Sequence, residues 1–295
     1  MEFIKTKTIL SKEKYGDTWY GIDYKINLYR GCPHGCIYCD SRSNCYHIDN
    51  FDVPKGKENA LILLEQELSK KKEKGVVGIG SMSDTYNPLE KQYEQTRGAL
   101  KLISKYHFGV SIDTKSNLIL RDIDLLKEIN KNNNVIIKFT ITTPKDGLSK
   151  IIEPHVCVSS KRFKAIKTLT DNGIYTGIMM NPVLPFITDK EEDIKELVRL
   201  AHESGAKFIH SYMGMTLREN QRDYYFEKLD KNFKGLKDKY LKYYGERYNC
   251  PVPNYKKLYK VLTDECDKYG ILYNMKDIIK AYKKEIKENE QISLF

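Results

Sequence analysis

Three cysteines near the start of the chain carry the clearest chemical signal in the sequence. Cys32, Cys36 and Cys39 are separated by three and then two residues, within a segment that runs from Arg30 to Asp40. Thiolates are the ligands that iron–sulfur clusters require, and a cubane cluster normally takes four of them. The spacing therefore favours a [4Fe-4S] cluster held by three cysteines, with one iron left for a ligand from elsewhere.

Other interpretations of these cysteines are a zinc site and a disulfide framework. Gly31 and Gly35 suit a loop that folds around a small inorganic body, because glycine adopts backbone angles that other residues avoid. Zinc could recruit Cys45, His34 or His47 as a fourth ligand, but structural zinc usually uses well-separated pairs of ligands. A disulfide framework is disfavoured because the seven cysteines are an odd number and the amino-terminal residues do not resemble a secretory signal.

The bulk composition predicts a folded protein with no membrane segment. The chain has 295 residues, 40% of them hydrophobic, which is enough for a core of one barrel-sized domain or a domain with an appendage. No apolar run approaches the roughly 20 residues that a membrane helix needs. We therefore expect a cytoplasmic protein, in a compartment where thiols stay reduced. The net charge of +10 is compatible with a polyanionic partner such as nucleic acid.

Short β-like runs alternate with amphipathic helical runs through most of the chain, which is the pattern of repeated βα units. The predicted strands are 26–30, 75–80, 109–114, 135–142, 174–181 and 207–211. The predicted helices are 59–71, 91–105, 122–130, 161–171 and 191–204. The sequence therefore predicts an α/β fold, a partial (β/α)6 TIM-like barrel open on one side. Catalytic residues of such barrels lie at the carboxyl ends of the strands, and the cysteine loop directly follows the first predicted strand.

The last part of the chain has a different composition, which predicts a second unit. Residues 216–295 are lysine-rich and helical in pattern, contain eleven of the 22 tyrosines, and are interrupted at 250–253. We assign residues 1–215 to the partial barrel, with the cluster loop at 30–42, and residues 216–295 to a helical C-terminal extension. Its tyrosines either pack on the barrel and close its open side, or form a basic aromatic surface that stacks on bases and contacts phosphates.

The cysteine spacing, with Tyr38 at the aromatic position before the third cysteine, resembles the radical SAM (S-adenosylmethionine) superfamily. Within it, the chain is similar to the spore photoproduct lyase-like family, often labelled DNA repair photolyases. This likeness covers about residues 32–185 and rests on these segments: Cys36-Ile37-Tyr38-Cys39-Asp40-Ser41-Arg42-Ser43, Ser83-Asp84-Thr85-Tyr86-Asn87-Pro88 with Glu90, Thr96-Arg97, Thr114-Lys115-Ser116, Thr140-Ile141-Thr142, and Glu153-Pro154 with Ser160 and Arg162.

The resemblance implies two cofactors, a [4Fe-4S] cluster and SAM, and a role for several residues toward them. Cys32, Cys36 and Cys39 would hold the metal, and Tyr38 would adjoin it. Four further residues would bind SAM: Ser83, Asp84, Lys115 and Thr140. An acceptor after the second strand suits the methionyl amine, and the compact ammonium group of Lys115 suits the SAM carboxylate. Whether Thr140 or Thr142 reaches the lumen depends on the register of the strand.

Two departures from the family bear on the reaction, and they leave the catalytic residue unassigned. Ser81 stands where photoproduct lyases commonly have a cysteine that returns a hydrogen atom to the substrate. Asp40 stands where they have a tyrosine after the third cluster cysteine. Cys45 or Cys157 would substitute as hydrogen donor only if its side chain reached the lumen. Arg162 is either a site residue or the partner of Glu153 in an ion pair.

The sequence thus favours a radical SAM enzyme, lyase-like by resemblance, that generates a 5′-deoxyadenosyl radical. By resemblance, its substrate would be DNA or a nucleotide, with the reacting base extruded into the barrel mouth. An electron donor such as a flavodoxin or ferredoxin would reduce the cluster. The alternatives are a radical SAM enzyme with a non-DNA substrate and a non-catalytic iron–sulfur protein that senses redox state or binds a partner.

Overall fold

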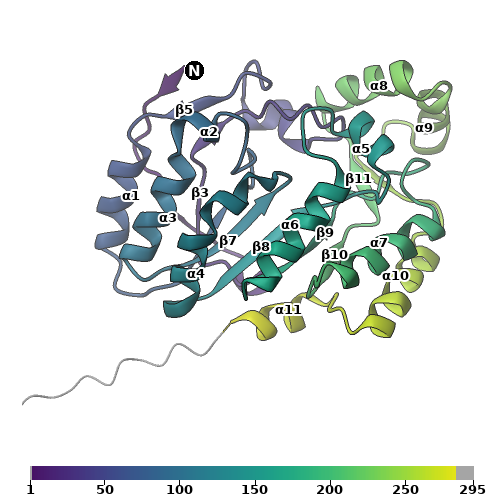
Figure 1. Cartoon of the computed structure of the whole chain (residues 1–295). Helices are drawn as coiled ribbons and strands as arrows, with labels where there is room; N and C mark the ends of the chain where they lie inside the picture. The colour runs from purple at the N-terminus through teal and green to yellow at the C-terminus, as the bar shows by residue number, and fades with distance from the viewer. Residues whose placement is uncertain (1, 284–295) are drawn as a thin grey trace, which may run out of the picture.

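The computed structural model describes residues 2–283 and is built on one mixed β-sheet (Figure 1). Its seven strands lie in the order β10-β9-β8-β7-β6-β3-β2. Six of them, from β3 to β10, are parallel and adjacent in chain order, whereas β2 pairs antiparallel with β3. The bounds are β2 (Ser11–Lys12), β3 (Tyr24–Ile26), β6 (Val76–Ile79), β7 (Gly109–Thr114), β8 (Val135–Thr140), β9 (Tyr175–Met180) and β10 (Ile209–Ser211).

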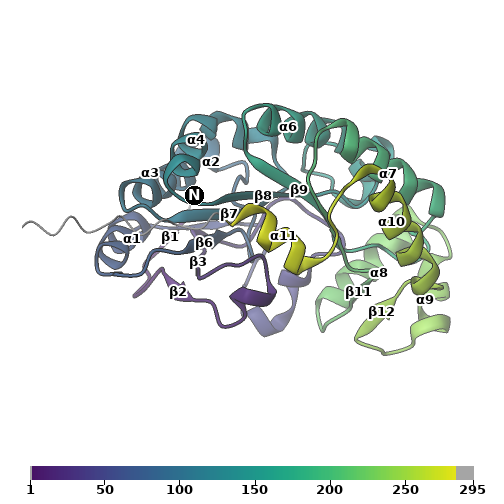
Figure 2. The ribbon, with the colours of Figure 1, turned by 90° about the horizontal axis from the view of Figure 1, so that it is seen from below.

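Helices that connect consecutive parallel strands cover one face of this sheet, and Figure 2 shows them in an arc. Buried strands such as β8, whose six residues are all buried, have the near-continuous apolar sequence of a parallel sheet covered on both faces. The connecting helices are α1 (Ala60–Ser69), α2 (Glu90–Tyr93), α3 (Gln95–Lys105), α4 (Ile123–Asn132), α5 (Asp146–Ile152), α6 (Ser159–Asp171) and α7 (Glu191–Glu203). The α/β class is confirmed, and closure of the sheet into a partial (β/α)6 barrel stays a prediction.

The prediction of a first strand over residues 26–30 was wrong at both ends, since β3 begins at Tyr24. The strand ends at Ile26, because its partner β6 ends at Ile79, the residue paired with Ile26. Residues Tyr29–Arg30 form β4, which pairs antiparallel with β5 (Lys55–Lys57) in a separate small sheet that also contains β1 (Phe3–Ile4). The cysteine loop therefore follows β4 rather than a strand of the main sheet.

On the other face of the sheet, a cluster of buried apolar side chains packs against the amino ends of the strands. Tyr20 and Ile22 from the amino-terminal segment pack there with residues at the starts of β6 and β8. Helix α11 (Met275–Tyr282) adds Ile278 and Tyr282 to the same cluster and lies across this end of the sheet (Figure 2). The carboxyl ends of the strands are left for the cysteine loop and its neighbours.

The C-terminal segment is mainly helical, as predicted. It contains α8 (Gln221–Asn232), α9 (Leu236–Tyr244), α10 (Tyr255–Tyr269) and α11. Strands β11 (Gly214–Thr216) and β12 (Asn249–Pro251) form an antiparallel pair that the sequence did not predict. Helix α10 packs on α7 and contributes to the main core (Figure 1). The division at 215/216 stays a prediction; that boundary falls inside β11, and residues 284–295 of the extension lie outside the described residues.

The tyrosines of this segment divide between packing and exposure. Those on the inner helix faces, including Tyr225, Tyr240 and Tyr282, are buried, whereas Tyr255 and Tyr259 on α10 are exposed. Among residues 2–283, no helix is long and apolar enough to span a lipid bilayer.

Candidate active site

The cysteine loop lies between β4 and a short 3-10 helix, Asp40–Arg42, and its backbone is held by hydrogen bonds to distant segments. The amide of Cys32 donates to the carbonyl of Phe51 at 2.8 Å, and the amide of Ile37 donates to Ile152 at 3.0 Å. Gly31 has a φ of 82°, and a Cβ there would lie 2.7 Å from the Phe51 oxygen. The turn into the loop therefore requires glycine at this position.

All three cysteines line one cavity of about 310 Å³, together with the five predicted cofactor residues Tyr38, Ser83, Asp84, Lys115 and Thr140. This volume is at the lower end of the range for small-molecule sites. The structure thus brings the predicted metal ligands and the predicted SAM residues to one place, at the carboxyl ends of β6, β7 and β8. Thr140 rather than Thr142 lines the cavity.

The chemistry of the three thiols fits a cationic cluster. They are free cysteines, and burial raises the pKa of Cys32 to about 12 and the pKa values of Cys36 and Cys39 above their ordinary value. Backbone N–H groups of His34 and Asp84 lower the pKa of Cys32, but burial outweighs them. Because metals deprotonate the thiols that coordinate them, the iron of a cluster would offset the cost of burying three thiolates.

The same side chains do not form a binding site for a single metal ion among residues 2–283. Within residues 2–283, no three His, Cys, Asp or Glu side chains are close enough together to hold one ion. Cys45 is exposed and lines a different cavity, beside Arg218. The zinc site with Cys45, His34 or His47 as fourth ligand therefore has no support in the described part of the chain.

Ser83 and Asp84 already make contacts that shape the site. The Ser83 hydroxyl donates to the Gly31 carbonyl at 2.6 Å, which ties the loop after β6 to the cysteine loop. The Asp84 carboxylate accepts from the Thr114 hydroxyl and from the Lys115 amide, both at 2.8 Å. These contacts position the two loops, whatever further ligand each residue binds.

The ammonium group of Lys115 is the cation that remains available in the cavity. Its Nζ forms no hydrogen bond or ion pair with any of residues 2–283 and lies 5.9 Å from the ring centre of Tyr38. Burial lowers the pKa of Lys115. The thiolate form of Cys36 and the Glu153 carboxylate raise this pKa by more than burial lowers it, so the net change is upward. Lys115 is therefore a charged donor placed to bind an anionic group.

A buried ion pair between Glu153 and Arg162 holds the hydroxyl group of Tyr38. The Tyr38 hydroxyl donates to Glu153, whose other oxygen lies 2.5 Å from Nη2 of Arg162. Arg162 also donates to the carbonyls of Thr140 and Cys157, each at 2.8 Å. Arg162 and Glu153 are both fully buried and do not line the cavity, so the ion-pair interpretation of Arg162 is confirmed.

The C-terminal segment holds the cysteine loop from the other side. Gln221 donates to the Tyr38 carbonyl at 3.1 Å, and Asn220 donates to the Arg42 carbonyl at 2.9 Å. The Arg42 guanidinium stacks 3.8 Å above the Tyr224 ring. Asp40, the residue that replaces the family tyrosine, accepts hydrogen bonds from Thr216 at 2.9 Å and Arg218 at 3.0 Å.

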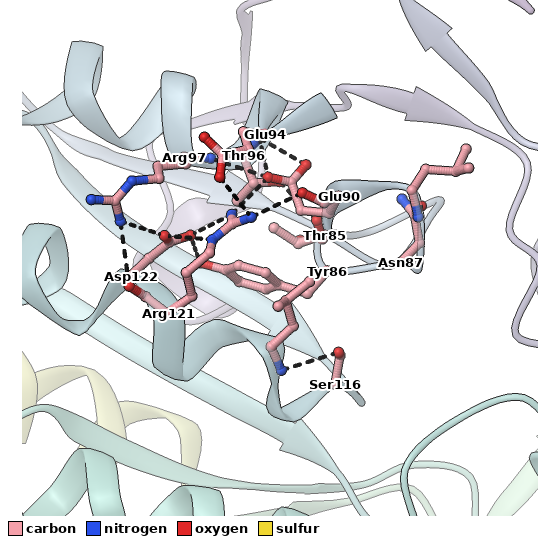
Figure 3. Close-up of polar contacts among 12 residues, drawn as sticks. Thr85, Tyr86, Asn87, Glu90, Glu94, Thr96, Arg97, Ser116, Arg121 and Asp122 are labelled. Carbon is pink, nitrogen blue, oxygen red and sulfur yellow. Dashed lines mark hydrogen bonds and ion pairs between the residues drawn. The ribbon is translucent and has the colours of Figure 1, made fainter. Parts of the chain in front are cut away.

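The remaining segments of the family likeness form a second buried network, shown in Figure 3. Glu90 accepts from the Thr96 amide at 3.0 Å and from Arg121 at 2.9 Å. Arg121 and Arg97 also converge on Asp122, to which Arg97 donates at 2.6 Å (Figure 3). These residues stabilise the loop that carries Ser83 and Asp84, because buried carboxylates and guanidinium groups need such pairing.

The residues weighed as hydrogen donors lie in different places. Ser81 lines the cavity and donates weakly to Asn27 at 3.3 Å. Cys157 donates to the Lys115 carbonyl at 3.1 Å and lines a neighbouring cavity. Within the described residues, neither Cys157 nor Cys45 lines the cavity of the three cysteines.

Trp19, Asp113 and Met179 also line the cavity, and sequence reasoning did not single them out for the site. Asp113 is paired with Lys138 of the next strand. Lys138 interrupts an otherwise apolar strand, and this could have indicated a buried acidic partner such as Asp113 on the neighbouring strand. The position of Trp19 depends on the long-range path of the amino-terminal segment and has no local signal.

This chain belongs to the radical SAM superfamily, whose family model matches residues 26–201. Members of that superfamily use a [4Fe-4S] cluster and SAM. An uncharacterised protein of Methanocaldococcus jannaschii is 37% identical over 180 residues, which is 60% of this chain and 66%, slightly under two thirds, of that relative. The spore photoproduct lyase of Clostridium acetobutylicum is 24% identical over 183 residues, 61% of this chain and 52% of the lyase.

The solved structures of spore photoproduct lyase have the same fold. A structure of that enzyme complexed with dinucleoside spore photoproduct has a TM-score of 0.67 and 14% identity, and the match covers 91% of this chain and 79% of the lyase. Another, of a cysteine-to-serine mutant of the lyase, has a TM-score of 0.66 at 14% identity and covers 92% and 80%. At this identity, the likeness establishes the architecture and not the substrate.

Proposed function

We propose that this protein is a radical SAM enzyme that holds a [4Fe-4S] cluster through Cys32, Cys36 and Cys39 and binds SAM beside it. One observation carries the proposal: three free thiols and the unpaired ammonium of Lys115 line a single cavity at the carboxyl ends of parallel strands, as the described residues 2–283 place them. The superfamily match supports it independently. The partial (β/α)6 barrel and a cytoplasmic location belong to the same proposal.

When bound, the reduced cluster and SAM together supply a 5′-deoxyadenosyl radical that abstracts hydrogen from the substrate. The protein's own residues bind and orient the cofactors. Lys115 binds the SAM carboxylate, since its ammonium group forms no hydrogen bond or ion pair within the described residues. Asp84 and Ser83 fix the loop at the methionyl end, and Thr140 presents a hydroxyl group from β8. Tyr38, anchored by Glu153, keeps the third cysteine in place.

For the substrate, we propose DNA or a nucleotide, with a lyase-like reaction. One solved neighbour, spore photoproduct lyase, is complexed with a dinucleoside photoproduct, and the net charge of +10 on this chain favours a polyanion. DNA binding should then weaken steeply as salt increases, because bound lysines and arginines release counterions. A flavodoxin or ferredoxin would supply the electron. Binding that does not respond to salt contradicts the nucleic-acid part of the proposal.

Anaerobic reconstitution followed by dithionite and SAM tests the enzyme itself. We expect a brown protein with iron and sulfide bound, and 5′-deoxyadenosine as a product. Cys36→Ala should lose both, whereas Cys45→Ala, which changes an exposed cysteine of another cavity, should keep both. An intact cluster without 5′-deoxyadenosine would contradict the enzyme and leave a non-catalytic cluster protein. Loss of iron from Cys45→Ala would contradict the assigned ligands.

A further inference from the structure

Two further polar side chains, Asp113 on β7 and Lys138 on β8, lie close to the candidate cofactor residues. Asp113 lies two residues before Lys115, and Lys138 lies two residues before Thr140. Residues two apart in a strand face the same side and are about 6.6 Å apart. Asp113 and Lys138 are also direct neighbours across β7 and β8. Asp113 thus lines the cavity next to the candidate cofactor residues, and Lys138 lies buried behind it.

Asp113 and Lys138 form an ion pair with one free acceptor atom. Nζ of Lys138 lies 2.7 Å from Oδ1 of Asp113 and 4.3 Å from the centre of the Tyr20 ring. Lys138 is fully buried, whereas the Asp113 side chain is 23% exposed although its Oδ1 is buried. Asp113 lines the cavity, and its Oδ2 has no hydrogen-bond partner among residues 2–283.

Stability alone does not account for this pair. Replacing a buried ion pair by apolar side chains of similar volume is often neutral or stabilising. Lysine is also rarely buried without a functional or structural partner. The ion pair holds the Asp113 side chain at the cavity wall with one oxygen left without a partner among residues 2–283, which suits recognition of a hydrogen-bond donor.

Trp19 supplies an aromatic surface in the same cavity. It is 36% exposed and makes edge-to-face contacts with Tyr20 at 5.1 Å and with His210 at 5.4 Å. These two neighbours hold the indole ring in a fixed orientation. Met179, which pairs with His210 across β9 and β10, lies on the same wall with a polarisable sulfur. A planar ring can stack on such a surface, as bases do on aromatic side chains.

We propose that Trp19 and Asp113 form the substrate end of the cavity and take a planar heterocycle that stacks on the indole and donates an N–H to Oδ2. Lys138 is a positioning residue that acts through Asp113. This inference rests on the proposed function and specifies the chemistry of its substrate. A carboxylate accepts but does not donate, so it selects a ring edge with an N–H, such as an imide, and repels phosphate. The base, rather than the phosphate, therefore enters first.

Thymidine and 3-methylthymidine are matched probes, because they differ only in the imide N–H. Equilibrium dialysis against the anaerobically reconstituted protein with SAM measures their affinities. Emission from Trp19, the only tryptophan of the chain, reports whether the ligand binds at this end. We expect thymidine to quench this emission saturably and 3-methylthymidine to bind at least about tenfold more weakly, since one hydrogen bond to a charged group is lost. Equal affinities, or no saturable quenching by thymidine, overturn the inference.

A paired variant separates recognition from folding. Asp113→Leu removes the acceptor but leaves the Lys138 ammonium buried without its counter-ion, so we combine it with Lys138→Met. The double variant should keep its bound iron and sulfide, which shows that it folds, but bind the two nucleosides equally. Ser111→Ala is the control, because Ser111 is buried on the same face of β7 and does not line the cavity. It should keep the tenfold preference, and a double variant that also keeps it contradicts the role of Asp113.

The outcomes distinguish this inference from the function beneath it. Cluster assembly and 5′-deoxyadenosine formation without a preference for thymidine reject the substrate end and leave the radical SAM enzyme in place. A thymidine preference in a protein that does not cleave SAM rejects the enzyme and leaves the nucleoside site.

Discussion

The buried ion pair beneath the cysteine loop allows a quantitative test of how the site is supported. Glu153 and Arg162 are both fully buried, and Glu153→Gln removes the negative charge while keeping nearly the same shape. The amide oxygen introduced by this substitution can still accept from Tyr38, so the loop keeps its anchor. The Arg162 guanidinium, however, is left in the interior without a counter-ion. The predicted effect is therefore on the free energy of unfolding, with little change in the amount of iron bound.

The size of the effect follows from what Arg162 retains. Breaking a buried pair by removing one partner typically costs about 3–5 kcal/mol. Arg162 keeps two carbonyl acceptors, on Thr140 and Cys157, which places the expected loss near the lower limit, about 3 kcal/mol. For domains of 150–250 residues, a loss of this size lowers the Tm by roughly 6–12 °C. Urea and thermal unfolding of the protein without its cluster measure it.

The double variant Glu153→Leu with Arg162→Met is the control. It removes both charges, so it should unfold within about 1–2 kcal/mol of the unmodified protein. It also removes the acceptor of the Tyr38 hydroxyl, so it should bind iron less tightly than Glu153→Gln. The reasoning is wrong if Glu153→Gln unfolds within about 1 kcal/mol of the unmodified protein, or if the double variant is the less stable of the two.

Three further predictions concern the loop and the lumen. Gly31→Ala should cost about 1–3 kcal/mol and lower iron incorporation, because the new Cβ would clash with the Phe51 carbonyl at a φ of 82°; Gly147→Ala, with no atom within 4 Å, should do neither. Ser83→Ala removes the 2.6 Å bond to the Gly31 carbonyl, so we expect a stability loss of about 1 kcal/mol and faster removal of iron by a chelator. Burial lowers the pKa of His210 from 6.5, so the unfolded chain binds a proton that the folded chain resists, and stability should fall as the pH drops below about 6.5; His210→Phe should flatten this part of a pH titration of unfolding.

The fold could be predicted where local pattern and burial agree. Five of the six predicted strands, and the main helices between them, match the structure, because parallel strands are continuous apolar runs and the helices have a regular apolar stripe. The prediction of the first strand failed because residues 27–30 have a strand-like composition, but Tyr29 and Arg30 pair with β5 in a different sheet. The β11–β12 pair joins segments more than 30 residues apart, and no local pattern indicates such pairing.

The site could be predicted where a motif fixes its residues. The three cysteines and the five candidate cofactor residues share one cavity, although their assignment to the cluster and SAM stays a prediction. The contacts that occupy Ser83 and Asp84 depend on loops far apart in the chain and could not be foreseen. The same holds for Asp113 and Trp19, whose relation to the cavity is fixed by strand register and by the path of the amino-terminal segment.

The contacts between the cysteine loop and residues 216–224 have a consequence for the order in which the protein matures. The three cysteines are translated early, but Gln221 and Asn220, which hold the loop carbonyls, are translated about 180 residues later. A ribosome-bound chain that has just completed the main sheet therefore exposes the thiols without their last supports. Because chains are made from the amino terminus, the loop reaches its final shape only after Asn220 and Gln221 have been synthesised. Delivery of iron and sulfide after residues 216–224 have folded onto the loop, rather than before, is the order of events that this architecture favours.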